Sequence, residues 1–221
     1  MIKKIADKLR LEFREKIGNP ILGKGRCDRL NVNGFTIISN NCWGGHVYRY
    51  FQLSYDSPTI GLYFFAEDYV KFVYDLRKYL EAEIRFVTYR ESRYKKELER
   101  KGQTHCPIGV IDDIEIVFLH YKTPEEALEK WTRRKKRIHW DQLVFKMSEQ
   151  NLCTAELLRK FDALPARRKL VFIFADYGLE SQVLFKEYLG KGEVANDTIR
   201  FRKYVDLINW INGKPFKRRL G

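Results

Sequence analysis

The sequence predicts an α/β fold, a three-layer α/β/α sandwich in which helices cover both faces of a mostly parallel, mixed sheet. Two observations lead to this prediction. Short apolar runs alternate with segments of helical periodicity along most of the chain. In addition, the apolar runs at 108–111 and 114–119 are too close together for a helical crossover. They form either a hairpin turned at Asp112-Asp113 or one bent strand, and a hairpin makes the sheet mixed.

The elements follow one another with few interruptions. Residues 2–16 carry apolar side chains at helical spacing on one stripe, namely Ile2, Ile5, Leu9 and Phe13. A glycine-rich connector over 18–34 leads to the first strand. Strands are expected over 35–39, 61–64, 83–88, 108–111, 114–119, 142–147 and 169–175. Helices are expected over 45–53, 66–81, 123–138, 154–164, 179–189 and 203–211.

A chain of 221 residues fits a single α/β domain. We expect an N-terminal helix and connector over 1–34, a core over 35–200, and a C-terminal helix with a basic tail over 201–221. No run of about 18 apolar residues occurs, and no apolar core follows the basic first residues, so neither a membrane span nor a signal peptide is predicted. The chain is therefore expected to be cytoplasmic, where its four scattered cysteines would stay reduced.

The formal net charge of +13 is the most unusual compositional feature. Basic residues cluster in the N-terminal segment and at 133–137, 167–169 and 217–219. Such a charge favours polyanionic partners, which include phosphorylated small molecules, an anionic membrane face and nucleic acid. A solvated, lysine-rich surface explains the total charge equally well. No recognised DNA or RNA module is present, which argues against nucleic acid.

The clearest candidate site is the polar loop that follows the first strand. Its proposed ligand-binding residues are Ser39, Asn40, Asn41, Trp43, Gly44 and Gly45. Ligands of open α/β sheets bind beyond the carboxyl ends of the strands, near helix N-termini. The two glycines permit close backbone approach, so amides there could hold a phosphate or carboxylate; a turn whose glycines serve only packing is the alternative. Cys42 could act as a nucleophile, but no partner histidine is identified, and we treat it as a bystander.

Three further residues complete the candidate site. Asp113 could serve as a base or hold a divalent cation that bridges to a diphosphate, whereas Asp112 is better suited to turning a hairpin. Arg134 falls on the packing side of its helix, where a guanidinium needs a carboxylate or a phosphate. His120 follows an apolar strand and could be a general acid or base, although a structural histidine is the commoner case.

Several stretches together resemble a bacterial family. They are Ser39-Asn-Asn-Cys-Trp-Gly-Gly45, Ser57-Pro-Thr-Ile-Gly-Leu62, Pro107-Ile-Gly109 and Phe118-Leu-His-Tyr121. These motifs are similar to those of the group called domain of unknown function 1919, whose members are often labelled exopolysaccharide biosynthesis proteins. The resemblance covers roughly residues 35–175. It implies an α/β/α fold and a place in surface-glycan assembly, and it assigns no catalytic residues.

Two functions follow as hypotheses. The first is a glycosyl or other group transferase that acts on a phosphorylated or nucleotide-linked sugar. In it the loop holds phosphate or sugar hydroxyls, Arg134 neutralises phosphate, and Trp43 stacks on the sugar ring. This arrangement requires Asp113 and Arg134 to lie beside the loop. The alternative is a non-catalytic binding protein that docks on an anionic membrane or on an acidic partner of the polysaccharide machinery.

Overall fold

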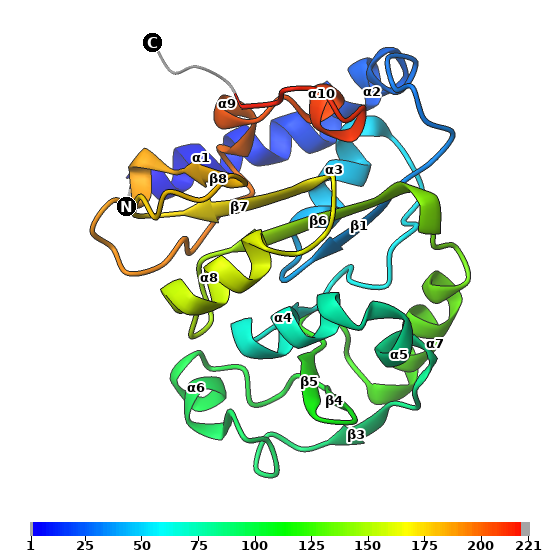
Figure 1. The fold of residues 1–221 in the computed structure, drawn as a ribbon, viewed down its shortest axis with the longest axis vertical. Coiled ribbons are helices and arrows are strands. Elements are labelled where there is room, and N and C mark those ends of the chain that lie inside the picture. The colour runs from blue at the N-terminus through cyan, green and yellow to red at the C-terminus, as the bar shows by residue number, and fades with distance from the viewer. Residues whose placement is uncertain (1, 218–221) are drawn as a thin grey trace.

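The strands form two separate sheets. The computed structural model describes residues 2–217, without the side chains of residues 2–5 and 8, so Arg218 and Arg219 of the basic tail lie outside the described residues. In the first sheet four parallel strands lie in the order β1-β6-β7-β8 (Figure 1). They span β1 (Thr36–Ser39), β6 (Leu143–Ser148), β7 (Lys169–Ile173) and β8 (Gln182–Leu184). The segment between β1 and β6 contains the second sheet, which is antiparallel in the order β2-β5-β4-β3. It comprises β2 (Tyr63–Phe64), β3 (Arg85–Val87), β4 (Ile108–Ile111) and β5 (Ile114–Val117).

The α/β prediction is confirmed, with a difference in the sheet. The predicted mixed sheet is instead one parallel and one antiparallel sheet, because the connection from β1 to β6 is long enough to fold around strands of its own. β4 and β5 form the hairpin rather than one bent strand, and Asp112 adopts the left-handed conformation in its turn (φ 49°).

Helices cover both faces of the parallel sheet, as expected. Side chains that alternate along β1 point to opposite faces. Ile37 packs with α3 (Trp43–Phe51), α9 (Phe201–Tyr204) and α10 (Leu207–Ile211). Ile38 packs on the other side, with α4 (Ala66–Tyr74) and α8 (Ala155–Asp162).

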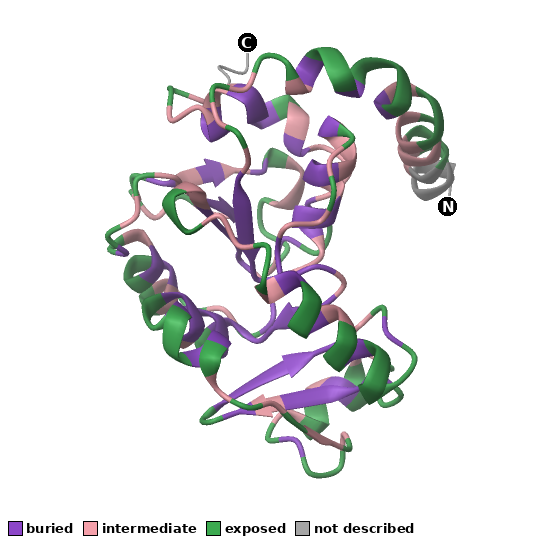
Figure 2. Ribbon diagram, turned by 90° about the vertical axis from the view of Figure 1, so that its right-hand side faces the viewer, coloured by how far each residue is buried: buried purple, intermediate pink, exposed green. Residues whose placement is uncertain are grey.

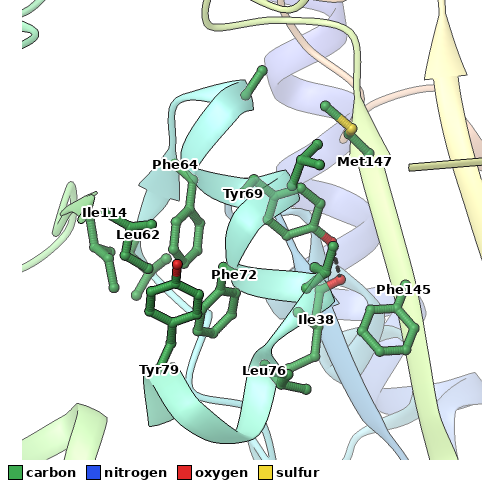
Figure 3. Packing of buried hydrophobic residues seen from close by; sticks show 14 of the residues in the cluster. Ile38, Leu62, Phe64, Tyr69, Phe72, Leu76, Tyr79, Ile114, Phe145 and Met147 are labelled. Atoms are coloured by element: carbon green, nitrogen blue, oxygen red, sulfur yellow. Dashed lines mark hydrogen bonds between the residues drawn. The ribbon is translucent and has the colours of Figure 1, made fainter. Parts of the chain in front are cut away.

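Helix α4 also joins the two sheets. Tyr69 and Phe72 of α4 pack in one apolar cluster with Ile38 of the first sheet and with Phe64 and Ile114 of the second (Figure 3). The Tyr69 hydroxyl lies 2.7 Å from the carbonyl oxygen of Ile38 and 2.8 Å from that of Lys146. The cluster is completed by α5 (Leu76–Glu81) and α7 (Pro124–Lys135), while α6 (Lys95–Arg100) covers the other face of the antiparallel sheet.

Two segments differ from the prediction, the connector over 18–34 and the segment over 179–189. The connector expected over 18–34 contains α2 (Asn19–Cys27), which continues from α1 (Ile2–Phe13) through the π-helical turn η1 (Arg14–Gly18). A proline in its first turn favours this helix start. The helix predicted over 179–189 is wrong: this segment forms β8 and the short 3-10 turn η3 (Lys186–Tyr188), because pairing with β7 outweighs its helical periodicity.

Two short elements complete the fold, and neither α6 nor the 3-10 turn η2 (Trp140–Gln142) was predicted. Within residues 2–217, no helix has the length and apolar character needed to cross a bilayer.

Candidate functional site

A polar pocket lies where the carboxyl ends of β1 and β6 meet the unit that carries the antiparallel sheet. Its volume is about 310 Å³. The parallel sheet contributes residues that follow β1 and β6, and the inserted unit contributes Tyr63 of β2 and residues after α6 and β5. The loop over 195–198, before α9, completes the lining. The lining comprises Asn41, Cys42, Trp43, His46, Tyr63, Lys101, Gln103, Leu119, His120, Gln150, Asn151, Ala195, Asn196, Asp197 and Thr198. This is the place where open parallel sheets bind their ligands.

The first two residues of the predicted loop join strands and do not line the pocket. Asn40 is fully buried, and its side chain donates to the carbonyl oxygen of Ser148 (2.9 Å) and accepts from the amide of Ser148 (2.9 Å). Ser39 is also fully buried, and its amide donates to the hydroxyl of Thr59 (3.1 Å). Asn40 therefore joins the ends of β1 and β6, whereas Ser39 ties the end of β1 to the segment before β2.

Trp43, Gly44 and Gly45 serve packing. The Trp43 side chain is fully buried, with edge contacts to Phe172, Phe201 and Trp210 at 5.2–5.7 Å, so its ring faces are not available to a sugar. A Cβ on Gly44 would lie 3.4 Å from Ile37, which shows how closely α3 packs on β1. The two glycines therefore allow close helix packing, which is the alternative that the sequence left open for them.

A buried polar cluster forms the floor of the pocket. The Lys146 ammonium pairs with the Asp197 carboxylate, and both side chains are almost completely buried. Asn41 joins the two segments, since its Oδ1 accepts from Lys146 (2.8 Å) and its Nδ2 donates to Asp197 (2.8 Å). Ser148 donates to the same carboxylate (2.6 Å). This network ties the loop after β1 to the loop that contains Asp197.

Burial governs the charges in this cluster. It lowers the pKa of Lys146 to about 8, although Asp197 opposes the shift. Burial alone would raise the pKa of Asp197, but Lys146 and the hydrogen bonds from Ser148 and Asn41 lower it overall. Cys42, beside the cluster, has its thiol pKa raised to about 12 by burial and by Asp197. Cys42 is therefore a neutral thiol and a poor nucleophile.

A histidine and a carboxylate meet at the pocket wall. His46 lines the pocket, and its Nδ1 lies 2.5 Å from Oε1 of Glu15 in η1. Arg49 lies 3.2 Å from the same carboxylate oxygen. Burial, and then Arg49, lower the pKa of His46, while Glu15 opposes the shift. With Nδ1–H donating to Glu15, Nε2 of a neutral His46 is left to accept a proton.

Other polar groups of the pocket have no partner in the protein. Among residues 2–217, the side chains of Lys101, His120 and Gln150 make no hydrogen bond or ion pair. Gln103 accepts from the Tyr63 hydroxyl (2.6 Å) through Oε1, so its amide nitrogen remains available. The pocket therefore offers an ammonium, two imidazoles and two carboxamides to a ligand.

The structure does not bring Asp113 or Arg134 to this pocket. Asp113 lies in the β4–β5 turn, where it accepts from Tyr79 (2.7 Å) and pairs with Lys71 (3.0 Å). Arg134 is buried, and its guanidinium donates to the carbonyl oxygen of Ile60 (3.1 Å) and to Tyr121. The predicted site with Asp113 and Arg134 beside the loop does not form, because both side chains have structural partners elsewhere.

Several pocket residues were missed in the sequence. His46 directly follows Gly45 in the motif that drew attention, and its position alone was a usable signal. Lys146 is a charge in an otherwise apolar strand, which signals a buried partner. Among the residues described, no three or more His, Cys, Asp or Glu side chains are grouped so that they could hold a metal ion.

The fold and pocket define an α/β protein with a ligand-sized polar site at the carboxyl edge of a parallel sheet. Comparison with known families then gives its affiliation: the chain belongs to the family described as Domain of unknown function (DUF1919), whose model matches residues 14–212. It is also 27% identical over 192 residues to an uncharacterized protein of Haemophilus influenzae. That match covers 83% of this chain and 87% of the relative.

Proposed function

We propose that the pocket binds a phosphorylated or nucleotide-linked sugar, and that the protein transfers the sugar to an acceptor hydroxyl. The pocket residues take the roles that the sequence assigned to Asp113 and Arg134, whose predicted arrangement beside the loop does not form. The observation that carries the proposal is a single pocket that holds the unpartnered side chains of Lys101, His120 and Gln150. The pocket also holds the free amide nitrogen of Gln103 and the Glu15-oriented His46. Carboxamides suit sugar hydroxyls because each both donates and accepts, and an unpaired ammonium suits a phosphate.

Pocket size sets which part of the substrate is enclosed. Small-molecule sites span roughly 300–1,000 Å³. At about 310 Å³, this pocket matches one sugar with its phosphate. The nucleotide of a nucleotide-sugar would extend over the exposed rim at His120.

The transfer assigns a task to each group. The acceptor hydroxyl oxygen attacks the anomeric carbon, and its proton passes to Nε2 of His46. The bond between the anomeric carbon and the phosphate oxygen breaks, and the electron pair leaves with that oxygen. Lys101 and His120 donate to the departing phosphate. Glu15 is a positioning residue, because it fixes the tautomer of His46.

Binding variants test the pocket. Titration calorimetry with a panel of sugar 1-phosphates and nucleotide-sugars should identify a ligand whose affinity falls about tenfold in Lys101→Gln, since a hydrogen bond to a charged group contributes about 1.5–3 kcal/mol. His120→Gln should weaken the same ligand. Lys96→Gln is the matched control, because Lys96 is exposed on the adjoining helix and outside the pocket lining. Equal affinity in Lys101→Gln and Lys96→Gln would contradict the proposed phosphate contact.

A separate variant tests the chemistry. His46→Gln should lower kcat by about 10²- to 10⁴-fold, the usual contribution of general base catalysis, while ligand affinity changes little. Ligand binding with no turnover in the native protein would instead support the non-catalytic alternative. Unchanged kcat in His46→Gln would remove His46 from the mechanism.

A further inference from the structure

The N-terminal helical segment presents an apolar stripe to solvent. Leu9, Phe13, Ile17 and Ile21 recur at every fourth position through α1, η1 and α2, which places them along one side of the segment. Their exposed fractions are 61%, 63%, 46% and 72%. We call this set the N-terminal stripe. In Figure 2 the segment runs along the upper right of the molecule, with much of its ribbon exposed.

The opposite side of the same segment is fixed to the protein. Arg14 donates to the carbonyl oxygens of Thr198 (2.9 Å) and Ile199 (3.1 Å). Asp7 pairs with Arg200 (3.2 Å), and Glu15 pairs with His46. These contacts hold the segment in one orientation, so the exposure of the stripe is a property of the fold. A line of large apolar side chains in water is the mark of an interaction surface.

The charges beside the stripe identify the kind of partner. Arg10, Lys16 and Lys24 are exposed in the same segment. None of the three forms an ion pair with another described residue. Asp7 and Glu15, by contrast, are turned inward to basic partners, and Glu12 is half-buried and also has an interaction partner. A second copy of a chain with a net charge of +13 would be repelled at this face. An anionic surface would be attracted.

We propose that the N-terminal stripe docks on an anionic lipid bilayer. The apolar side chains would enter the boundary between headgroups and acyl chains, while Arg10, Lys16 and Lys24 extend to the lipid phosphates. Because Arg14 and Glu15 contact residues that line the pocket, docking brings the pocket to the membrane surface. The proposal does not depend on the chemistry proposed for the pocket.

Vesicle binding of the full chain tests it. We expect sedimentation with vesicles of phosphatidylglycerol and phosphatidylcholine, and little with pure phosphatidylcholine. The triple variant Leu9→Gln/Phe13→Gln/Ile17→Gln should bind at least about tenfold more weakly. The matched control Leu128→Gln/Leu152→Gln/Leu189→Gln removes leucines that are 42%, 53% and 52% exposed elsewhere, and it should bind like the native protein.

Charge and insertion are tested independently. Arg10→Gln/Lys16→Gln/Lys24→Gln should weaken binding about 100-fold, since each basic residue contributes about 1 kcal/mol at an anionic surface. The Phe13→Trp variant should show a shift of emission to shorter wavelengths on anionic vesicles alone. The proposal is overturned if the native chain ignores anionic vesicles or if the stripe variant binds like its control. Self-association that the stripe variant abolishes, without vesicle binding, would also overturn it and assign the face to a second copy.

Discussion

Removal of Asp197 should destabilise the protein because it leaves the Lys146 ammonium buried without its counterion. Both side chains are almost completely buried, and Asp197 also accepts from Ser148 and Asn41. Breaking a buried ion pair at one partner costs about 3–5 kcal/mol. In the variant, Lys146 can avoid a buried, unpaired charge by losing its proton. At pH 7, deprotonation of a group with an ordinary pKa of 10.5 costs about 5 kcal/mol, which sets the upper limit of the loss. We therefore expect Asp197→Ala to lose about 3–5 kcal/mol of unfolding free energy at pH 7.

The stability of the protein should also depend on pH through Lys146. The folded pKa of Lys146 is lowered to about 8, so between pH 8 and 10.5 the unfolded chain holds a proton that the folded chain lacks. Stability from this group therefore rises with pH in that window, by up to about 1.4 kcal/mol per unit. Without Asp197 the folded pKa falls further. The unfolding free energy of Asp197→Ala should therefore already rise between pH 7 and 8. In the native protein, Lys146 changes the unfolding free energy little over that range.

Urea denaturation at pH 7, 8 and 9 measures both effects. The double variant Lys146→Met/Asp197→Asn is the control, because it removes both charges and keeps an apolar stem beside the rings of Trp43 and Phe172. It should recover about 2 kcal/mol or more relative to Asp197→Ala. If Asp197→Ala costs less than about 1 kcal/mol of unfolding free energy at every pH, the ion pair does not stabilise the loop.

Four other outcomes follow from local geometry. The acid limb of the pH profile of kcat/KM should lie below about pH 6.5, because burial lowers the pKa of His46. Glu15→Gln should move this limb to lower pH and Arg49→Gln should move it to higher pH. Shifts of the same sign in both variants would contradict the pairing of His46 with Glu15. Cys42 should resist iodoacetamide at pH 8 in the folded protein, and mass spectrometry of the labelled peptides would show its reaction if the thiol were activated. Gly109→Ala should lower the unfolding free energy in urea titrations by about 1–3 kcal/mol, because the added Cβ would lie 2.4 Å from the Ile84 side chain. An unchanged unfolding free energy would mean that Ile84 can move away. Leu152→Gly should raise the thermal midpoint of unfolding, because the exposed Leu152 has a left-handed φ of 63°. This conformation costs a residue with a Cβ about 1 kcal/mol, and glycine avoids that cost. A lower midpoint in the variant would contradict this reason.

The sequence predicted β1, β6 and β7 of the parallel sheet but not the edge strand β8. β1, β6 and β7 are dense apolar runs, and such runs are the clearest sign of buried parallel strands. β8 is a three-residue edge strand inside a segment of helical periodicity, and only its pairing with β7 makes it a strand. α2 forms despite three nearby glycines, one of which, Gly23, is required because a Cβ there would lie 2.3 Å from the Gln52 side chain.

The position of the site was more predictable than its members. A polar loop after a buried strand pointed to the edge of the sheet where the polar pocket lies, and His120 lines that pocket. Glu15 and His46 are 31 residues apart, and Lys146 and Asp197 are 51 apart. Spacing in the chain carries no information on such contacts. Arg134 shows the opposite error, since a buried guanidinium can be satisfied by a backbone carbonyl such as that of Ile60 as well as by a phosphate.

Crystals soaked with the nucleotide-sugar or sugar phosphate that binds most tightly give the most direct test of the pocket. We expect density for the phosphate within hydrogen-bond distance of Lys101, and for the sugar beside Gln103 and Gln150, with His46 facing the anomeric carbon. Density for the ligand at another site, with the pocket filled only by water, would contradict the proposed function.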